Sequence, residues 1–85
     1  MIYCLAVFRS RTHTVGFIEY MRSQGIDARA VNTPEKAKIG CGISARFPIE
    51  YTSFARHVIS ALSLTSFRGF YSVKKDGVRN IVTHL

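Results

Sequence analysis

The chain has 85 residues, of which 47% are hydrophobic, and its 12 Lys and Arg against 5 Asp and Glu give a formal net charge of +7. This hydrophobic content excludes a disordered chain, and the length is typical of one domain. No apolar run approaches the ~20 residues that span a bilayer, and the first residues lack the basic segment of a signal peptide. We therefore expect one domain over residues 1–85, located in the cytoplasm, with no membrane partner.

The first half of the chain predicts a strand, a helix and a second strand. The continuous apolar run at residues 2–8 is typical of a strand that is covered on both faces. Thr12 or Thr14 is expected to cap a helix that ends near Gln24. The side chains expected to face the core from this helix are Val15, Phe17, Ile18 and Met21. A second strand is predicted at residues 28–31.

The second half predicts three more strands and a second helix. A strand at 42–47 is followed by the clearest helical pattern of the chain, at 51–64. The apolar positions of that pattern are Tyr51, Phe54, Ala55, Val58, Ile59 and Leu62. A strand at 67–73 leads through the turn residues 75–77 to a short last strand at 78–82, because Asp-Gly favours tight hairpins.

The order of these elements predicts an α+β fold of the ferredoxin-like type. Strand, helix, strand, strand, helix, strand is the split βαβ plan, with an antiparallel sheet, two helices on one face and an extra C-terminal strand. The other sheet face would present apolar side chains, and a homodimer through the sheet is one way to cover them. This fold hosts many unrelated functions, so the function must come from particular residues.

The stretch KIGCGISARF contains the first candidate site. Glycines at positions 40 and 42 flank Cys41, where they free the backbone and leave the sulfur accessible. Three nearby cations would favour a reactive thiolate if their charges converge on it: Lys36, Lys38 and Arg46. A small buried residue at the start of a strand is the alternative interpretation of Cys41.

The remaining cysteine, Cys4, lies within the first apolar strand and is expected to be a core residue. Two cysteines are too few for a disulfide scaffold, and no zinc-ligand spacing is present. We therefore expect free thiols, no metal and no cofactor.

The turn before the first helix is a second candidate site. Two cations, two hydroxyl groups and an imidazole meet a helix N-terminus there, which is a pattern that suits an anion. The residues concerned are Arg9, Ser10, Arg11, Thr12 and His13. Farther along the chain, residues 68–71 (RGFY) resemble faintly the aromatic signature with which some RNA-binding sheets stack bases.

Several of these stretches together resemble a family of small bacterial domains described as selenium/sulfur carrier-like proteins. They are YCLAVFRSRTHT, MRSQGIDARAV, NTPEKAKIGCGISARF and FRGFYSV, within residues 3–73. The most specific piece is Thr33-Pro34 followed at short range by Cys41-Gly42. The resemblance implies that Cys41 bears a persulfide or selenide, which a donor such as a cysteine desulfurase supplies and an acceptor protein receives. Residues 74–85 lie beyond the resemblance.

Three functions stay open on this basis. The first is a thiol-based carrier or accessory protein, in which Cys41 is the carrier residue and the cations guide an acidic partner. The second is a basic binding module for nucleic acid or an acidic protein, which needs no covalent chemistry. The third is a structural dimerisation domain. All three describe a carrier or binding protein rather than an enzyme.

Overall fold

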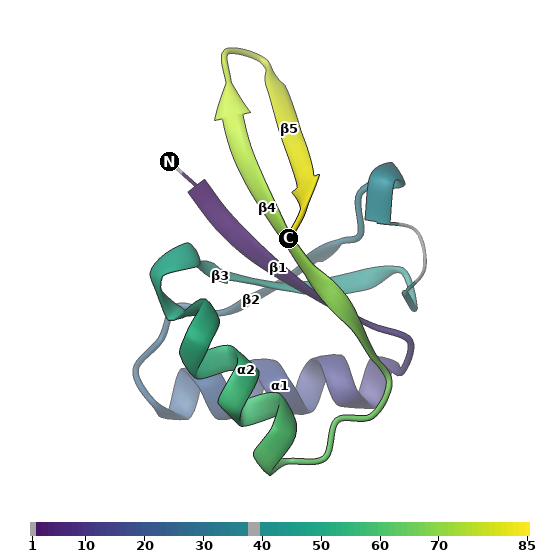
Figure 1. Cartoon of the computed structure of the whole chain (residues 1–85), viewed down its shortest axis with the longest axis vertical. Helices are drawn as coiled ribbons and strands as arrows, with labels where there is room; N and C mark the ends of the chain where they lie inside the picture. The colour runs from purple at the N-terminus through teal and green to yellow at the C-terminus, as the bar shows by residue number, and fades with distance from the viewer. Residues whose placement is uncertain (1, 38–39) are drawn as a thin grey trace.

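The sheet of this protein has five antiparallel strands in the order β2-β3-β1-β4-β5, and two α-helices pack on one of its faces (Figure 1). The computed structural model describes residues 2–37 and 40–85. The elements are β1 Ile2–Phe8, α1 Arg11–Ser23, β2 Arg29–Asn32, η1 Glu35–Ala37, β3 Ile43–Pro48, η2 Ile49–Tyr51, α2 Thr52–Ala61, β4 Phe67–Asp76 and β5 Arg79–His84. The α+β class and the extra C-terminal strand are confirmed. The two short 3₁₀ helices and β5 depart from a strict βαββαβ order.

The central strand β1 has buried side chains on both sides of the sheet. Cys4, Ala6 and Phe8 face the helices. Leu5 and Val7 are buried on the opposite face, which has no α-helix on it and is called the open face below, and there they pack with Ala37 and Tyr71. This explains the continuous apolar run, because a strand between two covered faces needs no polar alternation. The pairings Cys4↔Phe47 and Cys4↔Ser72 place β3 and β4 on its two edges.

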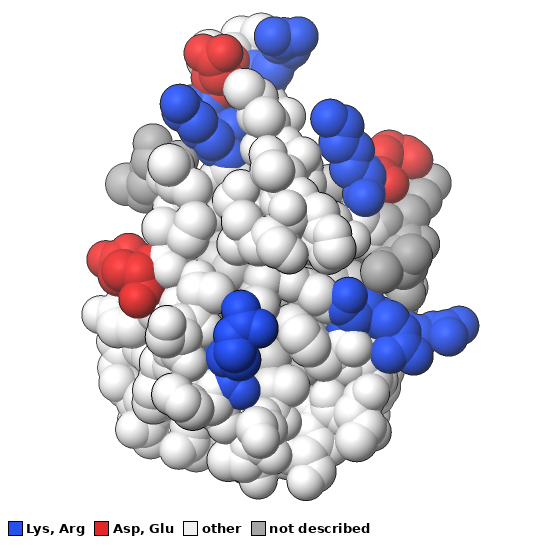
Figure 2. Space-filling model, in the orientation of Figure 1, with Lys and Arg blue, Asp and Glu red and all other residues white. Residues whose placement is uncertain are grey.

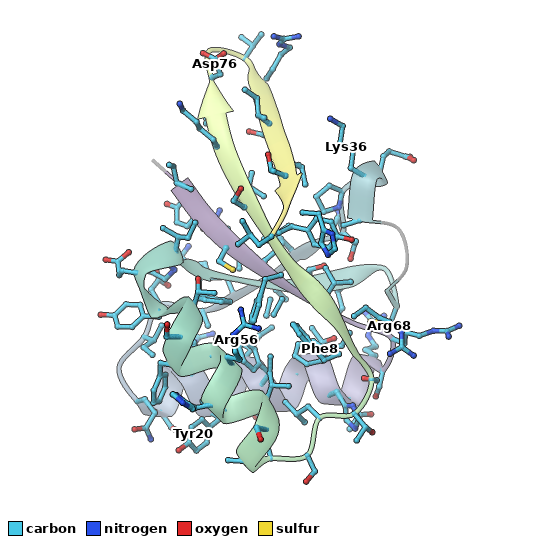
Figure 3. The ribbon with its side chains drawn as sticks, in the orientation of Figure 1. Phe8, Tyr20, Lys36, Arg56, Arg68 and Asp76 are labelled. Atoms are coloured by element: carbon cyan, nitrogen blue, oxygen red, sulfur yellow. The ribbon has the colours of Figure 1, made fainter. Side chains whose placement is uncertain are left out.

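A cluster of phenylalanine rings joins the helices to the sheet. Phe8 lies 5.4 Å from Phe17 of α1 and 5.6 Å from Phe67 of β4, measured between ring centroids. Phe67 and Phe70 are 4.7 Å apart, and Phe17 contacts Phe47 of β3 at 5.8 Å. Burial of each such ring stabilises the fold by about 1.5–3 kcal/mol. Figure 3 shows Phe8 between the sheet and the helices. The cluster thereby fixes the end of β1 against α1.

The beginning of α1 differs from the prediction. Ser10 is the N-cap, and its hydroxyl oxygen accepts the backbone N–H of His13 at 3.1 Å, so neither Thr12 nor Thr14 caps the helix. Thr14 is fully buried, whereas Val15 is 43% exposed. The buried face follows the i, i+3, i+4, i+7 spacing from Thr14, with Phe17, Ile18 and Met21. Val15 stands one position outside this face, so its predicted place in the core was wrong.

The second helical pattern is divided in the structure. Its first residue, Tyr51, ends η2, α2 ends at Ala61, and Ser63 has a φ of 53°. Ala55 and Val58 are buried as predicted, but the side chains at the ends of the pattern are exposed. Those exposed side chains are Tyr51, Phe54 and Leu62. Among the described helices, none has the length and hydrophobicity required to cross a membrane.

The C-terminal hairpin is longer than predicted and extends beyond the body of the sheet (Figure 1). Its turn is Gly77-Val78, one residue later than expected, with Gly77 at a φ of +62°. On the open face, the rings of Tyr71 and His84 lie 4.7 Å apart, and Val82 packs nearby. The chain thus covers part of this face itself, and a homodimer through the sheet stays a prediction.

Candidate functional site around Cys41

Cys41 lies where the end of β1 meets the beginning of α1. Its backbone N–H donates to the carbonyl oxygen of Phe8 at 3.0 Å, which ties the segment before β3 to the end of β1. The carbonyl of the next residue, Gly42, accepts the N–H of Thr33 at 2.9 Å. The two parts of the most specific piece of the family resemblance, Thr33-Pro34 and Cys41-Gly42, are therefore in direct contact. Cys41 itself is half-buried.

Glycine is required at the two positions beside Cys41 for different physical reasons. A Cβ atom at Gly40 would lie 2.7 Å from Val7 Cγ1 and 2.9 Å from the carbonyl oxygen of Phe8. Gly42 has open space around it but a φ of +100°, in the left-handed region that side chains disfavour. Gly40 thus permits a close backbone approach, and Gly42 permits the turn into β3.

The sulfur of Cys41 has two polar neighbours. Sγ lies 3.7 Å from the hydroxyl oxygen of Thr14 and 3.6 Å from the carbonyl oxygen of Ile43. A thiol can donate its hydrogen to Ile43 while the Thr14 hydroxyl donates to the Ser10 carbonyl at 3.0 Å. A thiolate only accepts, so the Thr14 hydroxyl would turn from Ser10 toward the sulfur. Thr14 can therefore serve both protonation states.

Thr14 is the residue of this site that sequence reasoning missed as a functional residue. The rest of α1, β2 and η1 separate it from Cys41, and no motif links the two positions. Its helical spacing with Phe17, Ile18 and Met21 could have placed it on the buried face. That spacing does not point to Cys41, because the Thr14 hydroxyl can bond the Ser10 carbonyl of its own helix.

The predicted anion-binding residues are only partly gathered, and Ser66 contacts three of them. Its hydroxyl oxygen accepts the N–H of Ser10 at 3.2 Å and lies 2.6 Å from Nδ1 of His13. The carbonyl oxygen of Ser66 also accepts the N–H of Arg9 at 2.9 Å. These bonds join α1 to the segment before β4. The side chains of Arg9, Arg11 and Thr12 are exposed, and anion binding by this segment stays a prediction.

The three cations expected near the sulfur lie in different places. Lys36 is exposed on η1 and points away from the sheet (Figure 3). Lys38 lies outside the described residues. Arg46 sits on the open face, where its guanidinium carbon is 4.4 Å from the centroid of the Tyr3 ring. The thiol instead contacts Thr14 of α1, on the helix side, so Thr14 rather than Arg46 is brought to the sulfur.

Cys4 is a core residue, as predicted, with no exposed surface. Burial raises the pKa of its thiol, and a hydrogen bond with Thr52 and the charge of Arg56 oppose that shift in part. Within residues 2–37 and 40–85, no three His, Cys, Asp or Glu side chains are grouped to hold a metal ion.

The raised pKa of Cys4 predicts a loss of stability in alkali. In the unfolded chain this thiol ionises near pH 9.0, whereas its pKa in the folded protein is higher. The stability of the folded protein is therefore unaffected by this thiol below pH 9.0, and it falls as the pH rises from there through the folded pKa. The loss amounts to at most about 1.4 kcal/mol per pH unit. Urea unfolding across this range should show a steeper decline for wild type than for Cys4→Ala. Parallel declines would contradict the prediction.

The residues that resemble an RNA-binding signature are occupied by packing. Phe70 is buried in the helix-side core, and Tyr71 is buried against His84. Arg68 points outward at the flank (Figure 3). On the face that Figure 2 shows, cations lie at the hairpin tip, along one flank and singly at the front, and they form no continuous stripe there. Neither aromatic ring is free to stack on a base.

The comparison with protein families decides the relationship of this chain. A family model described as "Putative Se/S carrier protein-like" matches residues 3–72. The chain belongs to this family. Neither the curated proteins nor the solved structures gave a match. The carrier-like match confirms the resemblance seen in the sequence. It includes Cys41 and the contacting Thr14, and it ends within β4, so that β5 is outside it.

Proposed function

We propose that this carrier-like domain, with a ferredoxin-like arrangement extended by β5, carries sulfur or selenium on Cys41. The observation that carries the proposal is the contact of the half-buried Cys41 sulfur with the Thr14 hydroxyl, within residues 3–72 that match the family model. The other cysteine has no exposed surface and cannot meet a partner without unfolding. Cys41 is thus the one thiol of the described chain that suits transfer.

The proposed loading step is an exchange between a thiol and a persulfide. Cys41 gives up its proton, and its sulfur attacks the outer sulfur of a persulfide on the donor protein. A new S–S bond forms, the S–S bond of the donor breaks, and the donor cysteine leaves as a thiolate that takes up a proton. No net oxidation occurs, so no further reagent is required. In the same exchange with selenium as the outer atom, an S–Se bond forms on Cys41 while the S–Se bond of the donor breaks, so that Cys41 bears a perselenide. Delivery repeats the exchange with a thiolate of the acceptor as the attacking group and the Cys41 thiolate as the leaving group.

The surrounding residues would hold Cys41 in place for this exchange. The Phe8 carbonyl fixes its backbone, and the Thr14 hydroxyl is placed to donate to the sulfur when its proton has left. Charge-assisted hydrogen bonds to an anion are stronger than those between neutral groups. The net charge of +7, to which the exposed Lys36 contributes, would draw an acidic donor or acceptor protein.

Loading with sulfur tests the proposal directly. The protein is incubated with a cysteine desulfurase and cysteine, without reductant, and its peptides are examined by mass spectrometry. We expect one added sulfur on the Cys41 peptide, none on the Cys4 peptide, and no loading of Cys41→Ser. Circular dichroism should show an unchanged fold in that variant. Loading that persists in Cys41→Ser would overturn the carrier proposal.

A further inference from the structure

The open face of the sheet contains a hollow of about 320 Å³, which is a volume typical of small-molecule sites. Leu5, Val31 and Val73, from three different strands, form its apolar floor. Pro34 bounds it on the side of η1, and Asn80 bounds it on the side of the β4–β5 hairpin.

Among the residues that the structure describes, two cations line this hollow and no acidic residue does. Arg46 comes from β3 and Lys75 from β4, so their charges approach from different strands. Across the part of the chain that the structure describes, the one ion pair joins Arg29 to Asp27, so Arg46 and Lys75 have no carboxylate partner there. The hollow is therefore positively charged and uncompensated.

The contact of Arg46 with Tyr3 prepares its guanidinium for an anion. The guanidinium carbon lies 4.4 Å from the ring centroid, and this stacking holds the side chain without using its N–H donors. Those donors suit the paired oxygens of a carboxylate, sulfonate or phosphate. An apolar floor below such a group requires a ligand with an apolar body.

We propose that this hollow binds a small organic anion that has an apolar body and a carboxylate, sulfonate or phosphate group. The body lies on Leu5, Val31 and Val73, and the anionic group meets Arg46 and Lys75. The site is on the opposite face of the sheet from the helices, whereas the Cys41 sulfur contacts α1. It therefore stands independently of the sulfur-carrier proposal.

Two fluorescent probes test this site in the full chain. Anilinonaphthalene sulfonate has an aromatic body with an anionic group, and phenylnaphthylamine has the same rings without the charge. We expect saturable binding of the sulfonate, at least about tenfold tighter than binding of the neutral probe, and an approximately tenfold loss in Lys75→Gln and in Arg46→Gln. Arg68→Gln removes the same charge from an exposed residue outside the hollow and should bind as wild type. Cys41→Ser should also bind as wild type.

Several results would overturn the proposal. An equal loss of sulfonate affinity in Arg68→Gln and Lys75→Gln would show that only the overall charge of the protein matters. Equal affinity for the charged and the neutral probe would exclude an anion site. Methyl chemical shifts of Leu5, Val31 and Val73 that stay unchanged on saturation would place the probe elsewhere. Sedimentation as a dimer together with no saturable binding of the sulfonate would assign this face to a second copy of the chain. Because Lys75 is exposed, its variant tests the site without disturbing the core.

Discussion

Replacement of Gly40 by alanine is expected to destabilise the protein by about 1–3 kcal/mol, the usual cost of an overpacked site. The new methyl group would stand 2.7 Å from Val7 Cγ1 and 2.9 Å from the carbonyl oxygen of Phe8. Because that oxygen accepts the N–H of Cys41, the clash also disturbs the bond that holds the cysteine. Urea unfolding measures the effect as a lower midpoint with an unchanged slope.

Gly16 provides a matched control for that substitution. It lies within α1, and a Cβ atom there would meet nothing within 4 Å. Gly16→Ala should therefore stabilise the protein by roughly 0.5–1 kcal/mol, because alanine has the higher helix propensity. The same exchange thus has opposite signs at the two positions. A neutral or stabilising Gly40→Ala would contradict the close approach of the Cys41 segment to β1.

The two cysteines are expected to react with iodoacetamide at very different rates. Cys41 is half-buried and can react in the native state, whereas Cys4 has no exposed surface and reacts only after the structure opens. For a domain with the usual stability of at least about 5 kcal/mol, global opening slows Cys4 by about a thousandfold or more relative to Cys41. Time-resolved mass spectrometry of the two peptides measures both rates in one sample.

Denaturant and single-cysteine variants control this measurement. In concentrated urea the two rates should become similar, since both thiols are then in the unfolded chain. Cys41→Ala should leave a protein that resists alkylation, and Cys4→Ala should leave one that reacts fully. Comparable native rates would show that Cys4 is reachable without unfolding, which its complete burial excludes.

The strands and helices followed from the sequence where a single pattern decided them. The apolar run of β1 and the spacing of Phe17, Ile18 and Met21 in α1 were sufficient. Helix ends and the edges of the buried faces were less predictable. Val15 has the hydrophobicity of a core residue, but packing against β1 and β3 rotates α1 so that Thr14 takes the buried position. Which of two adjacent residues faces the sheet depends on these distant strands.

The candidate site was predictable only in its centre. Glycines on both sides singled out Cys41. A side chain at position 40 would clash with Val7 and Phe8 at the C-terminal end of β1, and the local sequence does not show this contact. The contact with Thr14 depends on how α1 packs, which local sequence does not specify. Arg46 is near Cys41 in sequence, yet strand alternation turns it to the open face. Distance along the chain was therefore a poor guide to which charges meet the sulfur.

The central place of β1 has a consequence for the order of folding. This first strand pairs with β3 and with β4, and Ile2 lies opposite Lys74, so most of the chain must be present before the sheet can close. Pairing strands that are so far apart in the sequence makes folding slower than in proteins whose contacts are local. The backbone N–H of Cys41 donates to the Phe8 carbonyl, and the backbone N–H of Ser10, at the start of α1, donates to the Ser66 hydroxyl. A chain still being synthesised would therefore have a cysteine at position 41 but not yet the site around it.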